Sequence, residues 1–313
     1  GIRVQHSEVR SIDLDGQAVK TSGPEIQYDY LIIALGAEYA QEQIPGLAEN
    51  SYHIYDLDAT LKFKKAVEDF SGGTIAVGIS RLPFKCPAAP YEVALLLDYH
   101  LKKRGIDRVK INFFTPEGMP LPAAGADIGG RALEFLKSRD IECSFKAKLK
   151  EVKTSEVHFE DGSITSFDLL FCVPPHIPPE PVVKAGLIDQ TRWIPVDPKT
   201  LRTRHENVYA VGDVTSVPTP SGYVPYLPKA GVFAHGQAEL VAHNIATEIK
   251  GRGNEKSWDG HGSCFLEVGF GQAAYVKGGW FTKPHPSIKF YKPSRIWHMQ
   301  KFLFEKYWMR HWF

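Results

Sequence analysis

A repeated pattern of short strands is the feature that most constrains the fold of this 313-residue chain. Residues 8–37 and residues 151–175 both read as strand, turn and strand, followed by an aromatic residue, an aspartate and an apolar strand. The apolar strands are YDYLII, which begins at Tyr28, and FDLLF, which begins at Phe167. Two copies of one supersecondary unit indicate two similarly built domains. Two unrelated meanders are the alternative, because strand-turn-strand patterns are common.

A doubly wound α/β pattern lies between the two copies. GTIAVG (73–78) reads as a buried strand, residues 89–105 as a helix, VKINFFTP (109–116) as the next strand and residues 127–139 as a second helix. Alternating strands and helices predict an α/β fold with a parallel sheet, which binds ligands at the carboxyl ends of its strands.

A third signal is NVYAVGDVT (207–215), an apolar strand that ends in Gly212 and Asp213. The periodicity of a helix begins near the sequence PKAG and continues to residue 249. Glycine permits close backbone approach, and an aspartate at a strand end can accept hydrogen bonds from a sugar-like chain. Taken alone, Gly-Asp after a strand is more often a turn, so its weight comes from the neighbouring patterns.

Composition excludes several functions. The chain has 37 basic and 36 acidic residues, so it carries no net electrostatic attraction for nucleic acid. It contains no HExxH, CxxC or GxSxG, and its 12 histidines are scattered, so we expect neither a metal site nor a serine hydrolase. No apolar run approaches the roughly 18 residues of a membrane-spanning helix.

Cys86 stands where a nucleotide-binding turn would need glycines. The segment PFKCPAAPYE (83–92) follows the 73–78 strand, and its prolines lack the amide hydrogens that bind a pyrophosphate. We therefore expect nicotinamide nucleotides to bind poorly here. The start of a helix near Pro90 and the neighbouring Lys85 favour a thiolate at Cys86, and Glu92 opposes it. A small buried residue that fills space is the alternative.

The chain resembles the flavoproteins of the pyridine nucleotide-disulphide oxidoreductase superfamily in its repeat and in the sequences YDYLIIALGA, NVYAVGDVT and PKAG. KCPAAPYE around Cys86 and GSCFLEVGFG around Cys264 resemble the sulfide:quinone oxidoreductases and the flavoprotein subunit of flavocytochrome c sulfide dehydrogenase. Such proteins open with a GxGxxG turn on FAD, so we expect this chain to lack roughly 60 to 80 N-terminal residues.

The resemblance implies an α/β fold like that of glutathione reductase, with two Rossmann-like dinucleotide-binding domains and a small C-terminal α+β region. The implied boundaries are 1–50 and 179–250 for the FAD-binding domain, 51–178 for a degenerate second dinucleotide-binding domain, and 251–313 for an interface or membrane-facing region.

The same resemblance assigns functional roles. In those families, cysteines in these two contexts form a redox-active disulfide, so Cys86 and Cys264 are the predicted catalytic pair. Sulfide would attack the disulfide, leaving a persulfide on one cysteine and a thiolate on the other. FAD would pass the electrons to a quinone or to cytochrome c, and polysulfide or elemental sulfur would be released. The predicted FAD contacts are Ala34, Leu35, Gly36, Gly212, Asp213 and Lys229, of which Lys229 would tune the flavin.

The other two cysteines, and the lack of a cysteine in residues 51–63, also bear on the predicted function. Cys143 and Cys172 lie on predicted strands among apolar residues, so we expect them in the core. Many sulfide:quinone oxidoreductases carry a third functional cysteine, and the corresponding segment 51–63 has none. A cytochrome-linked flavoprotein, an NAD(P)H-dependent reductase and a flavin-free interaction subunit therefore remain alternatives.

The segment 294–313 interleaves aromatic side chains with lysine and arginine. This composition is typical of a helix at a membrane surface, where aromatic rings sit at headgroup level and cations meet anionic lipids. We therefore expect a peripheral membrane protein that uses quinone, in a compartment that the sequence leaves open. The alternative is a helix that packs on its own domain or on a partner, which includes a second copy in a homo-oligomer.

Overall fold

A computed structural model describes residues 1–312, and the chain divides into two compact units. Unit 1 comprises Gly1–Glu38 and Ile177–His261. Unit 2 comprises Tyr39–His176 and Gly262–Phe313. The chain therefore enters each unit twice, and each unit combines segments that are distant in the sequence.

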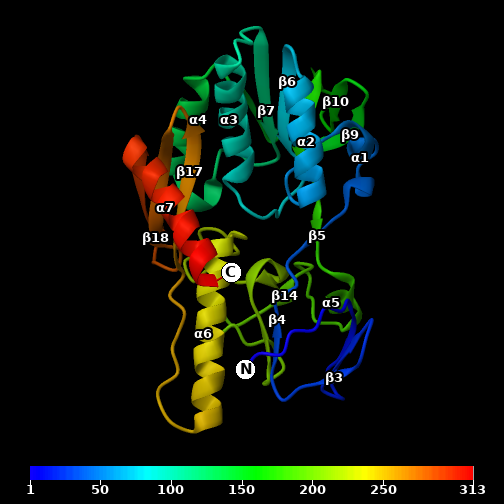
Figure 1. Ribbon diagram of the computed structural model, residues 1–313, viewed down its shortest axis with the longest axis vertical. Coiled ribbons are helices and arrows are strands. Elements are labelled where there is room, and N and C mark those ends of the chain that lie inside the picture. Colours follow the sequence, from blue (N-terminus) through cyan, green and yellow to red (C-terminus); the bar gives the residue numbers. More distant parts are fainter. Residues whose placement is uncertain (313) are drawn as a thin grey trace. The chain divides into compact units, whose positions relative to one another are not determined.

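A four-stranded sheet with the order β12-β6-β7-β8 forms the centre of unit 2. All three strand pairs are parallel. Helix α3 connects β6 to β7, and α4 connects β7 to β8 (Figure 1). The elements are β6 (Gly73–Ile79), α3 (Ala89–Lys103), β7 (Val109–Thr115), α4 (Ala126–Lys137), β8 (Glu142–Phe145), β12 (Leu169–Val173) and the additional helix α2 (Leu57–Asp69). The predicted α/β fold with a parallel sheet is confirmed.

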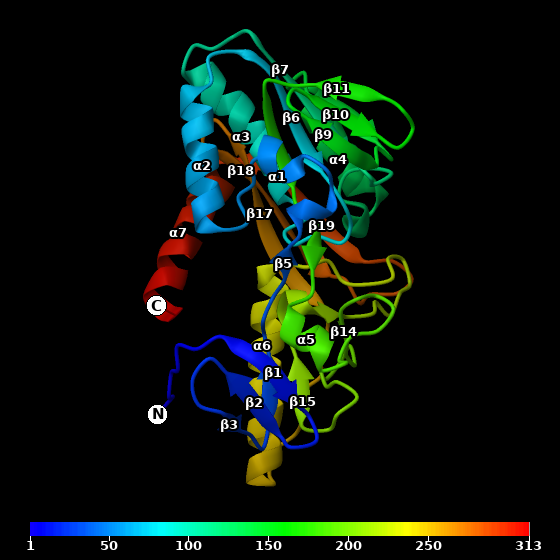
Figure 2. The same ribbon diagram turned by 90° about the vertical axis from the view of Figure 1, so that its right-hand side faces the viewer.

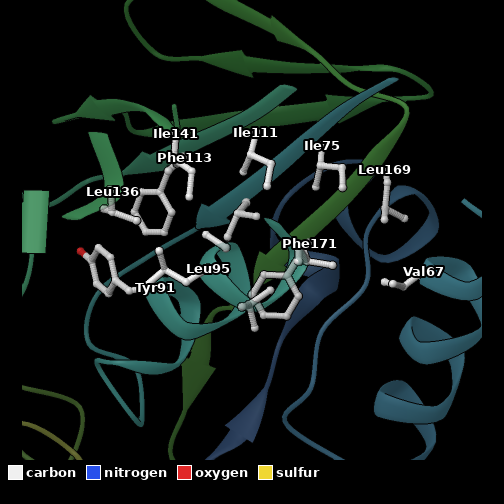
Figure 3. Packing of buried hydrophobic residues seen from close by; sticks show 14 of the residues in the cluster. Val67, Ile75, Tyr91, Leu95, Ile111, Phe113, Leu136, Ile141, Leu169 and Phe171 are labelled. Carbon is white, nitrogen blue, oxygen red and sulfur yellow. The ribbon is translucent and has the colours of Figure 1, made fainter. Parts of the chain in front are cut away.

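The core of unit 2 lies between this sheet and its helices. Figure 3 shows Tyr91 and Leu95 of α3 among the side chains of β7, including Phe113. The rings of Tyr91 and Phe113 stack with centroids 4.7 Å apart. On β6, a Cβ atom at Gly78 would lie 1.9 Å from the ring of Phe114. Packing inside the sheet therefore requires glycine at position 78. The sequence pattern alone, in which Gly78 precedes the loop that contains Cys86, does not predict this role.

The predicted repeat is present in both units. In unit 2, β9 (Leu149–Lys153), β10 (Glu156–Phe159) and β11 (Ile164–Ser166) form an antiparallel meander that leads into β12 (Figure 2). In unit 1, β1 (Val9–Asp13), β2 (Ala18–Thr21) and β3 (Ile26–Gln27) form the same arrangement and lead into β4 (Leu31–Ile33). Strand β4 pairs in parallel with β15 (Val208–Ala210). Each meander thus precedes a strand of a parallel sheet, as the sequence pattern predicts.

The rest of unit 1 surrounds the β4–β15 pair. Helix α6 (Gly231–Lys250) is its longest element and has Ala230 as its N-cap. Lys229 therefore lies just before this helix, whose first residue is the glycine of the sequence PKAG. The shorter elements are α5 (Glu180–Lys184), β14 (Ile194–Pro195), the 3₁₀ turn Gly212–Val214 and β16 (Thr215–Ser216).

The C-terminal part of unit 2 is the predicted α+β region. Strands β17 (His261–Gly269), β18 (Gln272–Gly279) and β19 (Ser287–Ser294) form one sheet, in which β18 and β19 are antiparallel, and α7 (Arg295–Trp312) packs on β18 (Figure 1). Within residues 1–312, no helix is both long and apolar enough to cross a membrane. The remaining short elements are β5 (Glu38–Tyr39), Gln41–Gln43, α1 (Leu47–Asn50), Pro122–Ala124 and β13 (His176–Ile177).

Candidate active site

Cys86 lies in unit 2, in the loop that joins β6 to α3. Its backbone has φ 56°, in the left-handed region that non-glycine residues rarely occupy. Its carbonyl accepts a 2.9 Å hydrogen bond from the amide of Ala89, the first residue of α3. The residue is exposed. The prediction that Cys86 shortly precedes a helix start near Pro90 is confirmed.

Cys264 lies on β17, also in unit 2. Its thiol donates to the carbonyl oxygen of Phe265 over 3.2 Å. The residue retains exposed surface, but protein atoms crowd the thiol, and this desolvation raises the pKa of Cys264 to about 12. The negative charges of Cys86 and then Glu92 contribute further to the raised pKa. The two predicted catalytic cysteines therefore lie close enough for the charge of Cys86 to affect the pKa of Cys264. The disulfide between them stays a prediction.

A charged network that the sequence did not predict adjoins Cys264. The amide of Glu267, on β17, donates a 2.7 Å hydrogen bond to Oε1 of Glu92 in the first turn of α3. From α7, Lys301 places Nζ 3.7 Å from a carboxylate oxygen of each glutamate. The Nδ1 atom of His298, also on α7, lies 3.0 Å from Glu267 Oε1. Strand β17 is thereby joined to both α3 and α7.

The charges of this network act on the Cys264 thiol in opposite directions. Burial raises the pKa of Glu92, against the lowering effect of Lys301 and of the Glu267 amide. The Glu92 charge raises the pKa of Cys264 and the Lys301 ammonium lowers it. A carboxyl group with a raised pKa beside a thiol is suited to hold or return a proton.

An aromatic cluster in unit 2 contacts Lys85, the residue before Cys86. The Tyr39 ring lies 5.1 Å from that of His176 and 5.8 Å from that of Tyr55, measured between centroids. Lys85 places its Nζ 5.0 Å from the Tyr39 centroid and 5.8 Å from the Tyr55 centroid. An ammonium over aromatic faces is held by cation–π attraction. The lysine next to Cys86 is therefore fixed in place near the cysteine.

In unit 1, the predicted cofactor residues follow two neighbouring parallel strands. Ala34, Leu35 and Gly36 follow β4, and Gly212 and Asp213 follow β15. Because β4 and β15 are parallel, both turns lie at the same edge of the pair. This is the edge at which open α/β sheets bind nucleotides.

Each of these two turns contains a glycine with left-handed backbone. Gly36 has φ 68°, and a Cβ atom there would meet nothing within 4 Å. Gly212 has φ 74°, and its amide donates a 2.7 Å hydrogen bond to Gln237 of α6. Leu35 is 40% exposed. Gly36 thus presents open, left-handed backbone to a ligand, as binding of FAD would require, whereas a Cβ atom at Gly212 would lie 3.1 Å from that of Ala234.

Lys229 is buried within unit 1. Its Nζ donates to the carbonyl oxygens of Asp213, over 2.6 Å, and Thr215, over 2.9 Å. The same atom lies 3.6 Å from the centroid of the Trp193 ring, a partner that the sequence did not predict. Burial lowers the pKa of Lys229 to about 7, against the raising effect of Asp213. Its role in tuning the flavin stays a prediction.

The other two cysteines lie on the strands predicted for them. Cys172, on β12, is fully buried, and burial raises its pKa. Cys143, on β8, is partly buried, and burial raises its pKa to about 11. Both thiols are protonated at neutral pH, and Cys172 is confirmed as a core residue.

Comparison with known proteins identifies the family. The sequence pattern of the pyridine nucleotide-disulphide oxidoreductases matches residues 1–238. The chain belongs to this family. It is 30% identical to the sulfide-quinone reductase of Aquifex aeolicus over 97% of the chain and 74% of that protein. It is 25% identical to the mitochondrial sulfide:quinone oxidoreductase of Mus musculus over 93% of the chain.

The solved structures give the same result. The crystal structure of sulfide:quinone oxidoreductase from Aquifex aeolicus superposes on this pyridine nucleotide-disulphide oxidoreductase with a TM-score of 0.84, over 97% of this chain and 74% of the solved one, at 25% identity. The chain spans 66% of the length of the mouse relative. The predicted family and the predicted fold class are both confirmed.

Proposed function

We propose that this chain is part of an FAD-dependent enzyme that oxidises sulfide at Cys86 and Cys264 and passes the electrons to a quinone. The hydrogen bond between Glu267 and Glu92, which joins the strand of Cys264 to the helix that follows Cys86, carries this proposal, together with the effect of the Cys86 charge on Cys264. The similarity to proteins named for sulfide:quinone oxidoreduction supports it. The cysteines occupy the two motifs that resemble those proteins.

FAD would bind to the turns of unit 1. The backbone of Gly36 and Gly212 would approach the pyrophosphate and ribityl chain, and the Asp213 carboxylate would accept hydrogen bonds from hydroxyl groups. Lys229, held beside Asp213, would supply a hydrogen-bond donor close to that site, and a positive charge below its lowered pKa of about 7. When bound, FAD accepts the electron pair that the cysteines release and passes it on.

The sulfur chemistry would take place in unit 2. Hydrosulfide attacks one sulfur of the Cys86–Cys264 disulfide, a new S–S bond forms there, and the other cysteine leaves as a thiolate with the electron pair of the broken bond. Lys301 stabilises negative charge on Cys264. The Glu92 carboxyl, whose pKa is raised, takes up or returns the proton that accompanies formation and loss of this thiolate.

The structure of the β6–α3 loop opposes a nicotinamide donor. Pro83, Pro87 and Pro90 lack amide hydrogens. The amide and the hydroxyl of Ser80, which begins the loop, both donate to the carbonyl oxygen of Val173. These four positions therefore offer no available amide hydrogen to a dinucleotide pyrophosphate.

A membrane-bound acceptor is supported by α7. Its residues Ile296, Met299, Leu303 and Tyr307 are 57% to 61% exposed and recur at helical spacing. An exposed apolar stripe next to lysine and arginine side chains is typical of a helix at a lipid surface. This arrangement favours quinone, which dissolves in the bilayer, over cytochrome c as the acceptor.

The test is anaerobic reduction of the purified full-length protein. We expect bound flavin to bleach on addition of sulfide, and we expect Cys86→Ser and Cys264→Ser to lose this bleaching. Cys143→Ser is the matched control and should bleach normally. Bleaching by NADH but not by sulfide would contradict the proposal, and absence of a flavin band would favour an interaction subunit.

A further inference from the structure

Tyr55 is held rigidly beside the predicted sulfur site in unit 2. Its carbonyl oxygen accepts a 2.8 Å hydrogen bond from the Tyr39 hydroxyl, and its amide donates to Nδ1 of His53 over 3.3 Å. Its ring lies edge-on to that of His176, with centroids 5.0 Å apart and planes at 90°. The position of the phenol is thus set by backbone hydrogen bonds and ring packing.

The hydroxyl of Tyr55 is enclosed by protein atoms. Among residues 1–312, its Oη atom is buried without a hydrogen-bond partner. Leaving a buried hydroxyl unsatisfied costs about 1 to 3 kcal/mol, and such groups in native proteins need an explanation. A ligand that accepts the hydrogen bond would remove this cost.

The charged groups around the phenol show which kind of ligand would fit. Burial, followed by the charge of Cys86 and then by Tyr39 and Cys172, raises the pKa of Tyr55 above its ordinary value. The phenol therefore keeps its proton at physiological pH and remains a donor close to Cys86. Lys85 adds positive charge 5.8 Å from the Tyr55 ring centroid. A protonated donor beside an ammonium favours a small anion bound at Cys86.

We propose that Tyr55 donates its hydrogen bond to a sulfur atom carried by Cys86, the terminal atom of a persulfide. This inference rests on the proposed function, which supplies the persulfide. Attack of hydrosulfide on Cys86 forms the new S–S bond while Cys264 leaves as a thiolate, so electrons and atoms balance. A second sulfur extends about 2 Å beyond the thiol, toward groups that the thiol itself does not reach.

A purely structural role of Tyr55 would give a different result in the Tyr55→Phe variant. If Tyr55 only fills space, phenylalanine replaces it without effect on sulfur chemistry, because ring packing against His176 is kept. If Tyr55 donates to the persulfide, its loss raises the pKa of that persulfide and makes its anion less available. The two cases are separated by the pH profile of the persulfide.

The experiment needs neither flavin reduction nor sulfide turnover. In the full-length Cys264→Ser protein, sodium tetrasulfide transfers one sulfur atom to the Cys86 thiolate and leaves as trisulfide. The product is then alkylated with iodoacetamide at several values between pH 5 and pH 9. Mass spectrometry of the Cys86 peptide measures the rate of this alkylation at each pH. We expect Tyr55→Phe to lower the alkylation rate on the acidic side about tenfold, equivalent to one pKa unit. Tyr52→Phe, which removes a hydroxyl from the same segment, should have no effect.

Two results would overturn the inference. One is an identical pH profile in Tyr55→Phe and in the parent protein; the other is a Cys86 that takes up no sulfur from tetrasulfide. Carbon-13 NMR of the Tyr55 Cζ atom in the otherwise unchanged protein gives a second reading, because a new hydrogen bond shifts its resonance when Cys86 is loaded. Absence of sulfide-driven flavin bleaching in the parent protein would instead count against the proposed function.

Discussion

The backbone amide of Glu267 donates a 2.7 Å hydrogen bond to the carboxylate of Glu92, and this bond joins β17 to the first turn of α3. Cys264 lies three residues before Glu267 on β17. Cys86 lies just before α3, whose first turn contains Glu92. The bond therefore fixes the two cysteine-bearing segments of unit 2 against each other. Its acceptor is charged and partly buried, which makes such a bond stronger than one between neutral groups.

The charge of Glu92 should control the reactivity of Cys264. Glu92→Gln keeps an acceptor oxygen for the Glu267 amide but removes the negative charge that raises the pKa of Cys264. In the Cys86→Ser background, we expect the rate of Cys264 alkylation at pH 8 to rise roughly three- to tenfold, because the thiolate is the reactive form. Lys301→Gln should slow it. Changes of the same sign in both variants would contradict this electrostatic account.

Gly78 should be intolerant of any side chain. In Gly78→Ala the new Cβ would lie 1.9 Å from the Phe114 ring, so the ring or the strand must move. We expect a loss of about 1 to 3 kcal/mol in the free energy of unfolding, measured by urea denaturation. Gly130→Ala, on α4 with nothing within 4 Å of the new atom, should instead gain up to about 1 kcal/mol. Equal effects would show that the packing at Gly78 is looser than described.

Lys229 should make stability depend on pH. Burial lowers its pKa to about 7 in the folded protein, from an ordinary value of 10.5. Between these values the unfolded chain binds the proton and the folded chain does not, so the free energy of unfolding rises with pH. The rise is at most about 1.4 kcal/mol per pH unit.

Lys229→Met removes this titration and keeps apolar contact with Trp193. The difference in unfolding free energy between the parent and Lys229→Met should therefore move in favour of the parent from pH 7 to pH 9. Urea denaturation at pH 7, 8 and 9 measures it. Parallel curves for the two proteins would refute the lowered pKa.

The apolar stripe of α7 should decide binding to lipid. Met299 and Leu303 are each 57% exposed, and burial of each in a bilayer contributes about 1.5 to 3 kcal/mol. We expect the double variant Met299→Glu, Leu303→Glu to bind anionic liposomes at least about tenfold more weakly in co-sedimentation. Gln300→Glu adds a negative charge off the stripe and is the control. Unchanged binding would assign the stripe to a protein partner.

Local patterns were enough to predict the fold. The strand periodicity around Tyr28 and Phe167 predicts the meanders and the strands that follow them, because alternation and turn residues act over short distances. The helix that begins beside Cys86 was predicted for the same reason. The family resemblance placed Cys264 near Cys86; no local pattern could have done so.

The contacts around the cysteines could not be read from the sequence. The Glu92, Glu267 and Lys301 network joins three elements that only the tertiary fold brings together, and each residue alone looks like a solvated charge. The contact between the Lys229 ammonium and the Trp193 ring could not be read from the sequence either. The unused hydroxyl of Tyr55 is visible only after every neighbouring donor and acceptor has been placed.

Cys86 occupies a backbone conformation that glycine would adopt without strain. For a residue with a side chain, the left-handed region costs roughly 1 kcal/mol or more. A thiol at this position therefore makes the protein less stable than the fold alone allows. If Cys86 acts as proposed, this loop is a place where stability and activity are in conflict, and a search for stabilising substitutions would select glycine there at the expense of catalysis.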